Sequence, residues 1–331
     1  MNKNNMRNLL TSIFLMFFVI FLFIECSQKK LESIKVAYVE ASSNLPFYVA
    51  LERGYFNDEG IKIEMTKAAN SSEALNLLAA GKVDASIENN YNVIYALAGK
   101  QPDLLKIVNP CYETKEHPIS HLLVKKDSKI RSFSDLKGKK IGTFSGASQL
   151  LVLKLYLKNK LNIDPEKDIT LLQVEMNLQI PSLDAGQFDA LFTVEPYSTV
   201  AIQKGTAISI DDYVRGEIMD PFPAGGTSIS IEAINNKKES ISKFISALDK
   251  AILDIQKEGT KINSILPKYT SLTKDIALNS QIYVFKTLKE TNTKDEILAL
   301  DLMKLYTDAK ILLPSSLVKG LFLNQKEINY E

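Results

Sequence analysis

The carboxylate of Glu195 is the group in this chain that most directly suggests chemistry. It follows the apolar residues 190–194, which predict a buried strand, and it precedes Pro196 and Tyr197. An ionised carboxylate at a strand end can accept hydrogen bonds from a ligand amine, amidine or ring N–H. The alternative is a structural ion pair with a lysine of the protein, where two halves of the chain meet.

Small polar residues and glycines follow three other apolar runs in the same way. In an open parallel sheet, ligands bind beyond the carboxyl ends of the strands, near helix N-termini whose backbone N–H groups lack a partner within the helix. Taken singly, each residue is explained equally well as a helix cap or a turn former. Taken together, they predict two rims that face each other across a ligand-binding cleft. The candidate residues are Ser42, Ser43, Asn44, Asn90, Tyr91, Ser145, Gly146, Ala147, Ser148, Glu195 and Tyr197.

Other chemistries find little support in the sequence. Residues 145–148 could hold an anion at a helix N-terminus, but no Gly-Lys-Ser/Thr follows, so we do not expect a nucleoside triphosphate. His117 and His121 are separated by Pro118, which would break the helix needed to bring both rings to one metal. We therefore expect no metal, no cofactor and no catalytic residue. The aromatic residues that could stack on a flat ligand in this tryptophan-free chain are Tyr91, Tyr112, Tyr197 and Phe222.

The elements that must position these residues come from an internal repeat. Residues 36–45 align with residues 141–150, and residues 78–85 align with residues 183–190, both at an offset of 105 positions. That offset is the size of a domain and far too long for a solenoid. Each copy has the order strand, helix, strand, helix, strand, which predicts an α/β unit with a mainly parallel sheet and helices on both faces.

The repeat predicts two lobes, and the chain crosses between them twice. Residues 121–125 and 228–231 are predicted as strands at these crossings, with a loop over residues 221–227. Asp84 and Asp189 occupy equivalent places in the two copies, and we interpret them as lobe architecture at a strand start, not as a catalytic pair. We expect lobe 1 over residues 34–120 plus 226–331, and lobe 2 over residues 121–225.

Apolar periodicity gives the approximate bounds of the individual elements. The expected strands span residues 34–39, 61–66 and 83–87 in the first copy, and 140–144, 169–174 and 190–194 in the second. The expected helices span residues 46–53 and 149–160. The C-terminal part is expected to be helical from about residue 236, with one apolar face over residues 241–255 and further helices over 274–290 and 293–310.

The N-terminus differs from the rest of the chain. Residues 9–24 carry no charge, and sixteen helical residues reach only about 24 Å, short of the ~30 Å hydrocarbon core. With Lys3 and Arg7 before this run, residues 1–25 are predicted to be an export signal. Cys26 then resembles the lipidated cysteine of a bacterial lipoprotein, followed by a linker over residues 26–33. Because Glu25 stands where such signals usually have a small residue, an uncleaved signal anchor is the alternative.

Composition excludes several classes of protein. The 331 residues include 40 Lys and Arg against 39 Asp and Glu, a formal charge of +1 that offers no basic surface for nucleic acid. After the predicted signal and Cys26, Cys111 is the one cysteine left, so the fold depends on its apolar core and not on an internal disulfide.

Several segments together resemble an extracytoplasmic solute-binding protein of an ABC importer. The likeness is to the NMT1/THI5-like and SsuA/TauA-like group, whose members serve nitrate, sulfonates and pyrimidine precursors of thiamine. It extends over nearly all of the chain beyond the signal. The segments that carry it are LPFYVALERGYFNDEG at 45–60, AAGKVDA at 79–85, DLKGKKIG at 135–142, AGQFDA at 185–190, EP at 195–196 and ILPKYT at 265–270.

This resemblance implies a two-lobed type II periplasmic-binding fold with two crossover strands and a hinge that closes on a small-molecule solute. It adds Gly226 and Thr227, in the predicted loop, to the candidate contacts, and it implies a lipid-anchored monomer that serves an ABC permease. No arginine falls in the candidate loops, which favours a neutral or cationic solute over an arginine-clamped sulfonate. The alternative is an enzyme on the same fold, either a pyrimidine synthase or a dehydratase of the menaquinone-pathway type. The export signal favours the receptor, and the cysteine-rich motif of the synthases has no match here.

Overall fold

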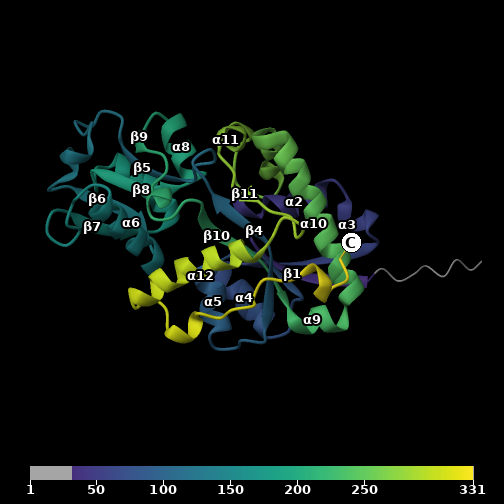
Figure 1. Cartoon of the computed structure of the whole chain (residues 1–331). Helices are drawn as coiled ribbons and strands as arrows, with labels where there is room; N and C mark the ends of the chain where they lie inside the picture. Colours follow the sequence, from purple (N-terminus) through teal and green to yellow (C-terminus); the bar gives the residue numbers. More distant parts are fainter. Residues whose placement is uncertain (1–31, 331) are drawn as a thin grey trace, which may run out of the picture. The chain divides into compact units, whose positions relative to one another are not determined.

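The structure, a computed structural model, describes residues 32–330. This part of the chain forms two β-sheets, each with helices packed against it (Figure 1). The predicted signal segment and Cys26 lie outside these residues. From Ser33 onward the described residues belong to one compact unit. Every helix between residues 32 and 330 is too short or too polar to cross a lipid bilayer.

The first sheet has the strand order β11-β4-β10-β3-β1-β2. β1 and β3 are parallel, and β10 runs antiparallel to both β3 and β4. Successive side chains of a strand point to opposite faces of the sheet. In β1, Val36 therefore packs with helices α2 and α10 on one face, and Ala37 packs with α4, α5 and α12 on the other. The strands are β1 (Glu32–Val39), β2 (Ile61–Ala68), β3 (Ala85–Asn90), β4 (Leu105–Glu113), β10 (Phe222–Ser230) and β11 (Val284–Phe285).

Helices cover both faces of the first sheet (Figure 1). The longest, α10, buries an apolar stripe that includes Phe244, Leu248 and Ile252, as its 3.6-residue periodicity predicts. The helices of this part are α2 (Leu45–Glu52), α3 (Tyr55–Asp58), α4 (Ser71–Ala79), α5 (Tyr91–Ala98), α9 (Ile231–Asn236), α10 (Lys238–Glu258), α11 (Lys274–Asn279) and α12 (Thr293–Asp308). Its 3-10 turns are η1 (Ser42–Asn44), η5 (Gly259–Lys268), η6 (Pro314–Ser316) and η7 (Gln325–Glu327).

The second sheet has the order β7-β6-β8-β5-β9, with β7, β6 and β8 parallel and β5 antiparallel to β8 and β9. Its strands are β5 (Ser120–Lys125), β6 (Lys140–Phe144), β7 (Thr170–Val174), β8 (Ala190–Val194) and β9 (Ala207–Asp211). The accompanying helices and turns are η2 (Phe133–Leu136), α6 (Ala147–Asn159), η3 (Met176–Leu178), α7 (Gln179–Asp184), α8 (Tyr197–Gln203) and η4 (Arg215–Glu217).

The sequence repeat is also a structural repeat. In the first sheet the backbone N–H of Lys35 donates to the carboxylate of Asp84 at 2.8 Å. In the second, the N–H of Lys140 donates to Asp189 at 2.8 Å, with both residues 105 positions further along. Each aspartate therefore ties the start of its own strand to a neighbouring parallel strand, within β1 at Lys35 and at the start of β6 at Lys140. The interpretation of the two aspartates as lobe architecture is confirmed.

The chain crosses between the sheets in two segments. It leaves the first sheet after β4 at Glu113 and enters the second at Ser120, and it returns between Asp211 of β9 and Phe222 of β10. The division into lobes at residues 120 and 226 stays a prediction. In the structure, the first strand of the second sheet, β5, begins at residue 120, and the strand that returns to the first sheet, β10, begins at residue 222.

Two predicted elements are wrong, and both sit on the first sheet. The expected loop over residues 221–227 lies largely within β10, because glycines allow this strand to lie tightly between β3 and β4. A Cβ on Gly225 would approach the backbone oxygen of Asn89 to 2.2 Å. The expected helix over residues 274–290 ends as α11 at Asn279, because the following residues pair instead with the edge of β4 as β11. The tertiary pairing overrides the local helical periodicity.

We predict that Gly225→Ala lowers the free energy of unfolding by about 2–3 kcal/mol, because the atom that its Cβ meets belongs to the backbone and cannot rotate away. Ser228→Ala on the same strand is the matched control. The Ser228 hydroxyl is buried without a hydrogen-bond partner among residues 32–330, so its loss should change stability by less than about 1 kcal/mol. Urea unfolding of both variants measures this, and equal effects would contradict the close approach of β10 to β3.

Candidate functional site

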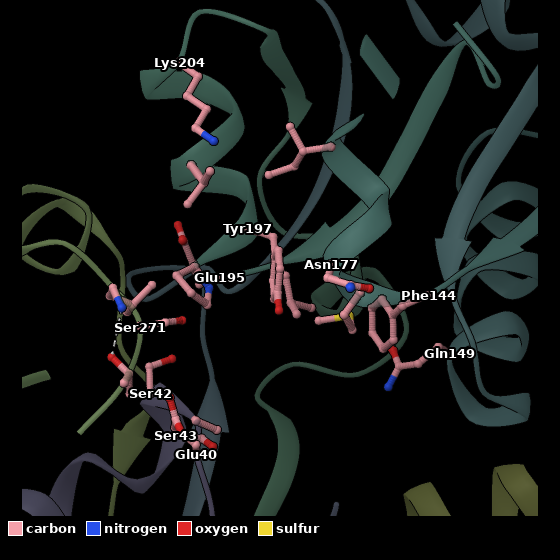
Figure 2. Close-up of a pocket in the computed structure, with 18 of the residues that line it drawn as sticks. Glu40, Ser42, Ser43, Phe144, Gln149, Asn177, Glu195, Tyr197, Lys204 and Ser271 are labelled. Carbon is pink, nitrogen blue, oxygen red and sulfur yellow. Dashed lines mark hydrogen bonds between the residues drawn. The ribbon is translucent and has the colours of Figure 1, made fainter. Parts of the chain in front are cut away.

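A cavity of about 850 Å³ lies between the two sheets, beyond the carboxyl ends of their parallel strands. The first sheet contributes the turn after β1 and the end of β3, joined by the segment after η5 and by Tyr283. The second contributes the ends of β6 and β8 and the turn that follows β7. Figure 2 shows the two sets of side chains on opposite sides of this space, with Ser42, Ser43 and Ser271 facing Phe144, Asn177 and Tyr197.

Five of the predicted site residues line this cavity. They are Ser42, Ser43, Asn90, Glu195 and Tyr197. All five follow or end strands β1, β3 and β8, so they lie where an open sheet places its ligands. The carboxyl-end rule therefore found residues on both sides of the cavity without any structural information.

The predicted cluster at residues 145–148 does not line the cavity, although its neighbours Phe144 and Gln149 do. The backbone N–H of Gly146 already donates to the side chain of Gln173 at 3.0 Å, so it is not free to hold an anion. Ser148 is buried within the first turn of α6, while residues 145–147 are exposed outside the cavity wall.

The remaining predicted residues belong to the interior of the first sheet. Asn44 is buried, and its side-chain amide donates to the backbone oxygen of Val39, which closes the turn after β1. Tyr91 packs edge-to-face against Tyr95 in the core beneath α5. Gly226 and Thr227 lie within β10, between β3 and β4. None of these four residues lines the main cavity.

Glu195 has protein partners of its own. His121 Nε2 lies 3.5 Å from Glu195 Oε1, and the hydroxyl of Thr199 donates to the same oxygen at 3.0 Å. The other imidazole nitrogen, Nδ1, lies 3.1 Å from the Asp212 carboxylate. Burial alone would lower the pKa of His121, but these two carboxylates raise it to about 9. The partner of Glu195 is thus a protonated histidine, where a lysine was the expected structural alternative.

The sequence analysis missed four further charged groups of the cavity wall, Glu40, Asp184, Lys204 and Arg215, of which Arg215 is buried. Arg215 lies in η4, within the second crossing segment, and is 6% exposed. Its guanidinium reaches Gln149 of the second sheet's helix α6 at 3.1 Å and the Tyr283 hydroxyl at 3.4 Å. No motif marks this arginine, and the sequence repeat ends at residue 190, before the strand β9 that precedes Arg215. The one signal in the sequence is that arginine is rare, because a chain with four arginines has few candidates for binding an anion.

A buried carboxylate holds the two crossing segments together. Glu113 is fully buried, and its Oε1 accepts from the backbone N–H groups of Ile119 and Ser120 and from the Ser120 hydroxyl, at 3.0, 2.8 and 2.6 Å. The hydroxyl oxygen of Ser120 in turn accepts from the backbone N–H of Arg215 at 2.9 Å. This chain of hydrogen bonds positions Arg215 at the cavity.

The cavity wall offers both apolar and polar contacts to a small molecule. The rings of Phe144 and Tyr197 offer apolar surface, and the serines, Asn90, Glu195 and Arg215 offer polar contacts. No cysteine or histidine of the described chain lines the cavity, and residues 32–330 contain no cluster of three or more His, Cys, Asp and Glu that could hold a metal ion. Cys111 is buried in β4, and its burial raises the thiol pKa.

Two α/β sheets joined by two crossing segments, with a cavity beyond the carboxyl ends of their strands, define the periplasmic-binding-protein class of fold. The chain belongs to the family described as NMT1/THI5 like, whose sequence profile matches residues 42–260. The structure resembles the periplasmic aliphatic sulphonate binding protein SsuA from Escherichia coli, with a TM-score of 0.72 over 88% of this chain and 92% of that one, at 15% identity. At this identity the likeness establishes the fold alone.

Two relatives by sequence differ in their described roles. The 4-amino-5-hydroxymethyl-2-methylpyrimidine phosphate synthase of Schizosaccharomyces pombe is 27% identical over 161 residues, which cover 49% of this chain and less than half, 44%, of that enzyme. A Bacillus subtilis protein named "Putative binding protein YtlA" is 26% identical over 259 residues, 76% of this chain and 73% of that one.

We predict that His121 titrates near pH 9. The pKa of His121 is raised from 6.5 in the folded state, so the charged imidazole stabilises the fold through Glu195 and Asp212. This contribution to the free energy of unfolding is fully present below about pH 6.5 and is lost as the pH rises through about 9. At about 1.4 kcal/mol for each pH unit, this amounts to roughly 3 kcal/mol relative to an uncharged side chain. The stability difference between wild type and His121→Gln should therefore shrink over this interval in urea unfolding.

The same prediction can be read directly by NMR. The chain has two histidines, so a His117→Gln variant assigns the signal of His121. Asp212→Asn should lower the pKa of His121, because it removes one of the two neighbouring carboxylates. Titration of His121 at or below pH 6.5 in the wild type would show that the ion pair with Glu195 does not form.

Proposed function

We propose that this chain is the extracytoplasmic solute-binding receptor of an ABC importer, which captures a small organic solute in the cavity between its sheets. The observation that carries this proposal is the cavity itself. It is lined from both sheets, and within residues 32–330 the chain passes between the sheets through two short segments, near residues 113–120 and 211–222, which would act as hinges. A solute that contacts both sides would favour a closed form over an open one.

The proposed contacts are the predicted residues that line the cavity, together with the aromatic walls. Ser42, Ser43 and Asn90 would contact the solute from the first sheet, and Glu195 and Tyr197 from the second. Phe144 and Tyr197 would pack against a flat or apolar part of it. The solute classes proposed are a heteroaromatic or amine-bearing molecule, such as a pyrimidine precursor of thiamine, or a sulfonate-type or nitrate-type anion. The first follows the name of the fungal relative, and the second follows the name of SsuA.

We also propose that Cys26 carries a lipid, which would hold the protein as a monomer on the outer side of a bacterial membrane beside its permease. The support is the uncharged run over residues 9–24 and the cysteine that follows it. An export signal would place the cavity where a solute enters the cell, which suits a receptor and not a cytosolic enzyme.

The second candidate function is an enzyme on the same fold, favoured by the match to a pyrimidine phosphate synthase. Against it stands the cavity lining, in which no described histidine or cysteine offers an acid, a base or a nucleophile. Of the carboxylates that line the cavity, Glu195 is paired with a protonated His121 and Glu40 with Lys67.

We predict that native mass spectrometry of the full chain, purified under mild conditions, finds one small molecule bound per monomer, and that this molecule is recovered unchanged after prolonged incubation. A receptor binds and releases its solute without forming or breaking covalent bonds, whereas an enzyme yields a product. Conversion of the bound molecule would overturn the receptor in favour of the enzyme. Ser43→Ala and Asn90→Ala should each lower occupancy, whereas Ser134→Ala, on an exposed turn of the second sheet's side, should not.

We predict that the wild-type chain, expressed in bacteria fed a labelled fatty acid, incorporates the label and fractionates with membranes. Cys26→Ser should abolish the labelling, because the thiol is the atom that would be lipidated. Cys111→Ser, which removes the buried cysteine, is the matched control and should keep the label. An unlabelled wild type that still fractionates with membranes would instead support the uncleaved signal anchor.

A further inference from the structure

The guanidinium of Arg215 is buried in the cavity wall with few acceptors. A guanidinium has five N–H groups, and here one reaches the Gln149 side-chain oxygen at 3.1 Å and one reaches the Tyr283 hydroxyl at 3.4 Å. The Nε atom is buried and has no hydrogen-bond partner among residues 32–330. Both acceptors are uncharged. A buried charge is costly unless its hydrogen-bonding groups are satisfied, so this site is incomplete as it stands.

The nearest carboxylate does not complete it. Glu113 Oε2 lies 3.9 Å from the Arg215 guanidinium, beyond hydrogen-bond distance, and that oxygen also lacks a partner in the described chain. Glu113 cannot simply move closer, because its Oε1 is fixed by three hydrogen bonds from Ile119 and Ser120. Glu113 therefore offsets part of the charge but satisfies none of the N–H groups of Arg215.

The neighbours of Arg215 add further donors to the same corner of the cavity. Tyr283 and Gln149 both use an oxygen to accept from Arg215, which leaves the Tyr283 hydroxyl hydrogen and the Gln149 amide hydrogens available. Asn90 lies beside Arg215 and Gln149 around a small adjoining pocket and brings another amide. A guanidinium flanked by a hydroxyl and amides matches an oxyanion, whose several oxygens accept such bonds in parallel.

We propose that Arg215, together with Tyr283 and Gln149, binds an oxyanion group of the solute, such as a carboxylate, sulfonate or phosphate. This inference rests on the proposed solute-binding function of the cavity and names the charge of one end of its solute. It replaces the expectation of a neutral or cationic solute, which depended on finding no arginine in the candidate loops. The group would contact α6 of the second sheet, Tyr283 beside β11 of the first, and the crossing segment that carries Arg215.

The test follows the Nε–H signal of Arg215 by NMR in the full chain labelled with ¹⁵N-arginine. Four arginines give a spectrum simple enough to assign by substitution, and Arg53, paired with Asp254 and Glu258, is an internal reference. The probes are acetate, methanesulfonate and inorganic phosphate, with acetamide and methanesulfonamide as uncharged counterparts. We expect at least one anion to move the Arg215 signal saturably and neither amide to move it. An Arg215 signal unmoved by all three anions at about 50 mM, where even a millimolar site is nearly full, overturns the proposal.

Substitutions give a second measurement. Arg215→Lys keeps the charge but loses the planar pair of donors, so it should weaken the anion by about tenfold or more. Arg131→Gln, on the surface of the second sheet's side and outside the cavity, should leave affinity unchanged. Equal affinity in wild type and Arg215→Lys would count against recognition by the guanidinium.

The co-purified molecule and the anion titration together test the oxyanion site separately from the receptor function. If the molecule that co-purifies is uncharged or purely cationic and is held unchanged, the receptor stands and the oxyanion site fails. If an anion binds at Arg215 but the co-purified molecule is converted to a product, the oxyanion site stands and the receptor fails.

Discussion

The cavity depends on how the chain passes twice between its two sheets. Glu113 ends β4, and its buried carboxylate accepts three hydrogen bonds from the residues that begin β5. The Ser120 hydroxyl then accepts the backbone N–H of Arg215 in the returning segment. One fully buried carboxylate thus fixes both crossings relative to each other, at the place where any movement between the sheets would have to occur. The cavity wall and the connection between the two sheets therefore share the same few residues.

The duplicated unit explains why polar residues line the cavity from both sides. In each sheet an aspartate just before one strand ties it to the parallel strand beside it, Asp84 to Lys35 and Asp189 to Lys140, and each pair is 49 positions apart. Aligning the starts of strands also aligns their carboxyl ends, where polar turns follow. The same construction, used twice, delivers Ser42 and Ser43 to one side and Glu195 and Tyr197 to the other. These cavity-lining residues thus follow from the strand architecture and not from a separate motif.

What the sequence allowed us to predict follows from which interactions are local. The strands, most helices and five cavity residues could be predicted, because apolar periodicity and the carboxyl-end rule depend on neighbours along the chain. The loop expected at residues 221–227 was wrong because glycine composition cannot show that two strands approach Gly225 from either side. The helix expected over residues 274–290 was wrong because β11 forms only against β4. The contacts of Arg215 with Gln149 and Tyr283, and of Glu195 with His121, join residues that are 66 to 74 positions apart. No local sequence pattern encodes such contacts.

The charge that the cavity offers is decided by these internal pairs more than by the number of charged residues in its wall. Glu195 was the group that suggested a cationic solute, yet its charge is balanced by His121, which Asp212 holds in the protonated form. Arg215 went unnoticed, yet its hydrogen bonds reach only uncharged acceptors. A solute gains most where the protein leaves a buried group unsatisfied, because the desolvation cost has already been met in the folded chain. By that reasoning we propose that Arg215, and not Glu195, decides the charge of the solute that the cavity prefers.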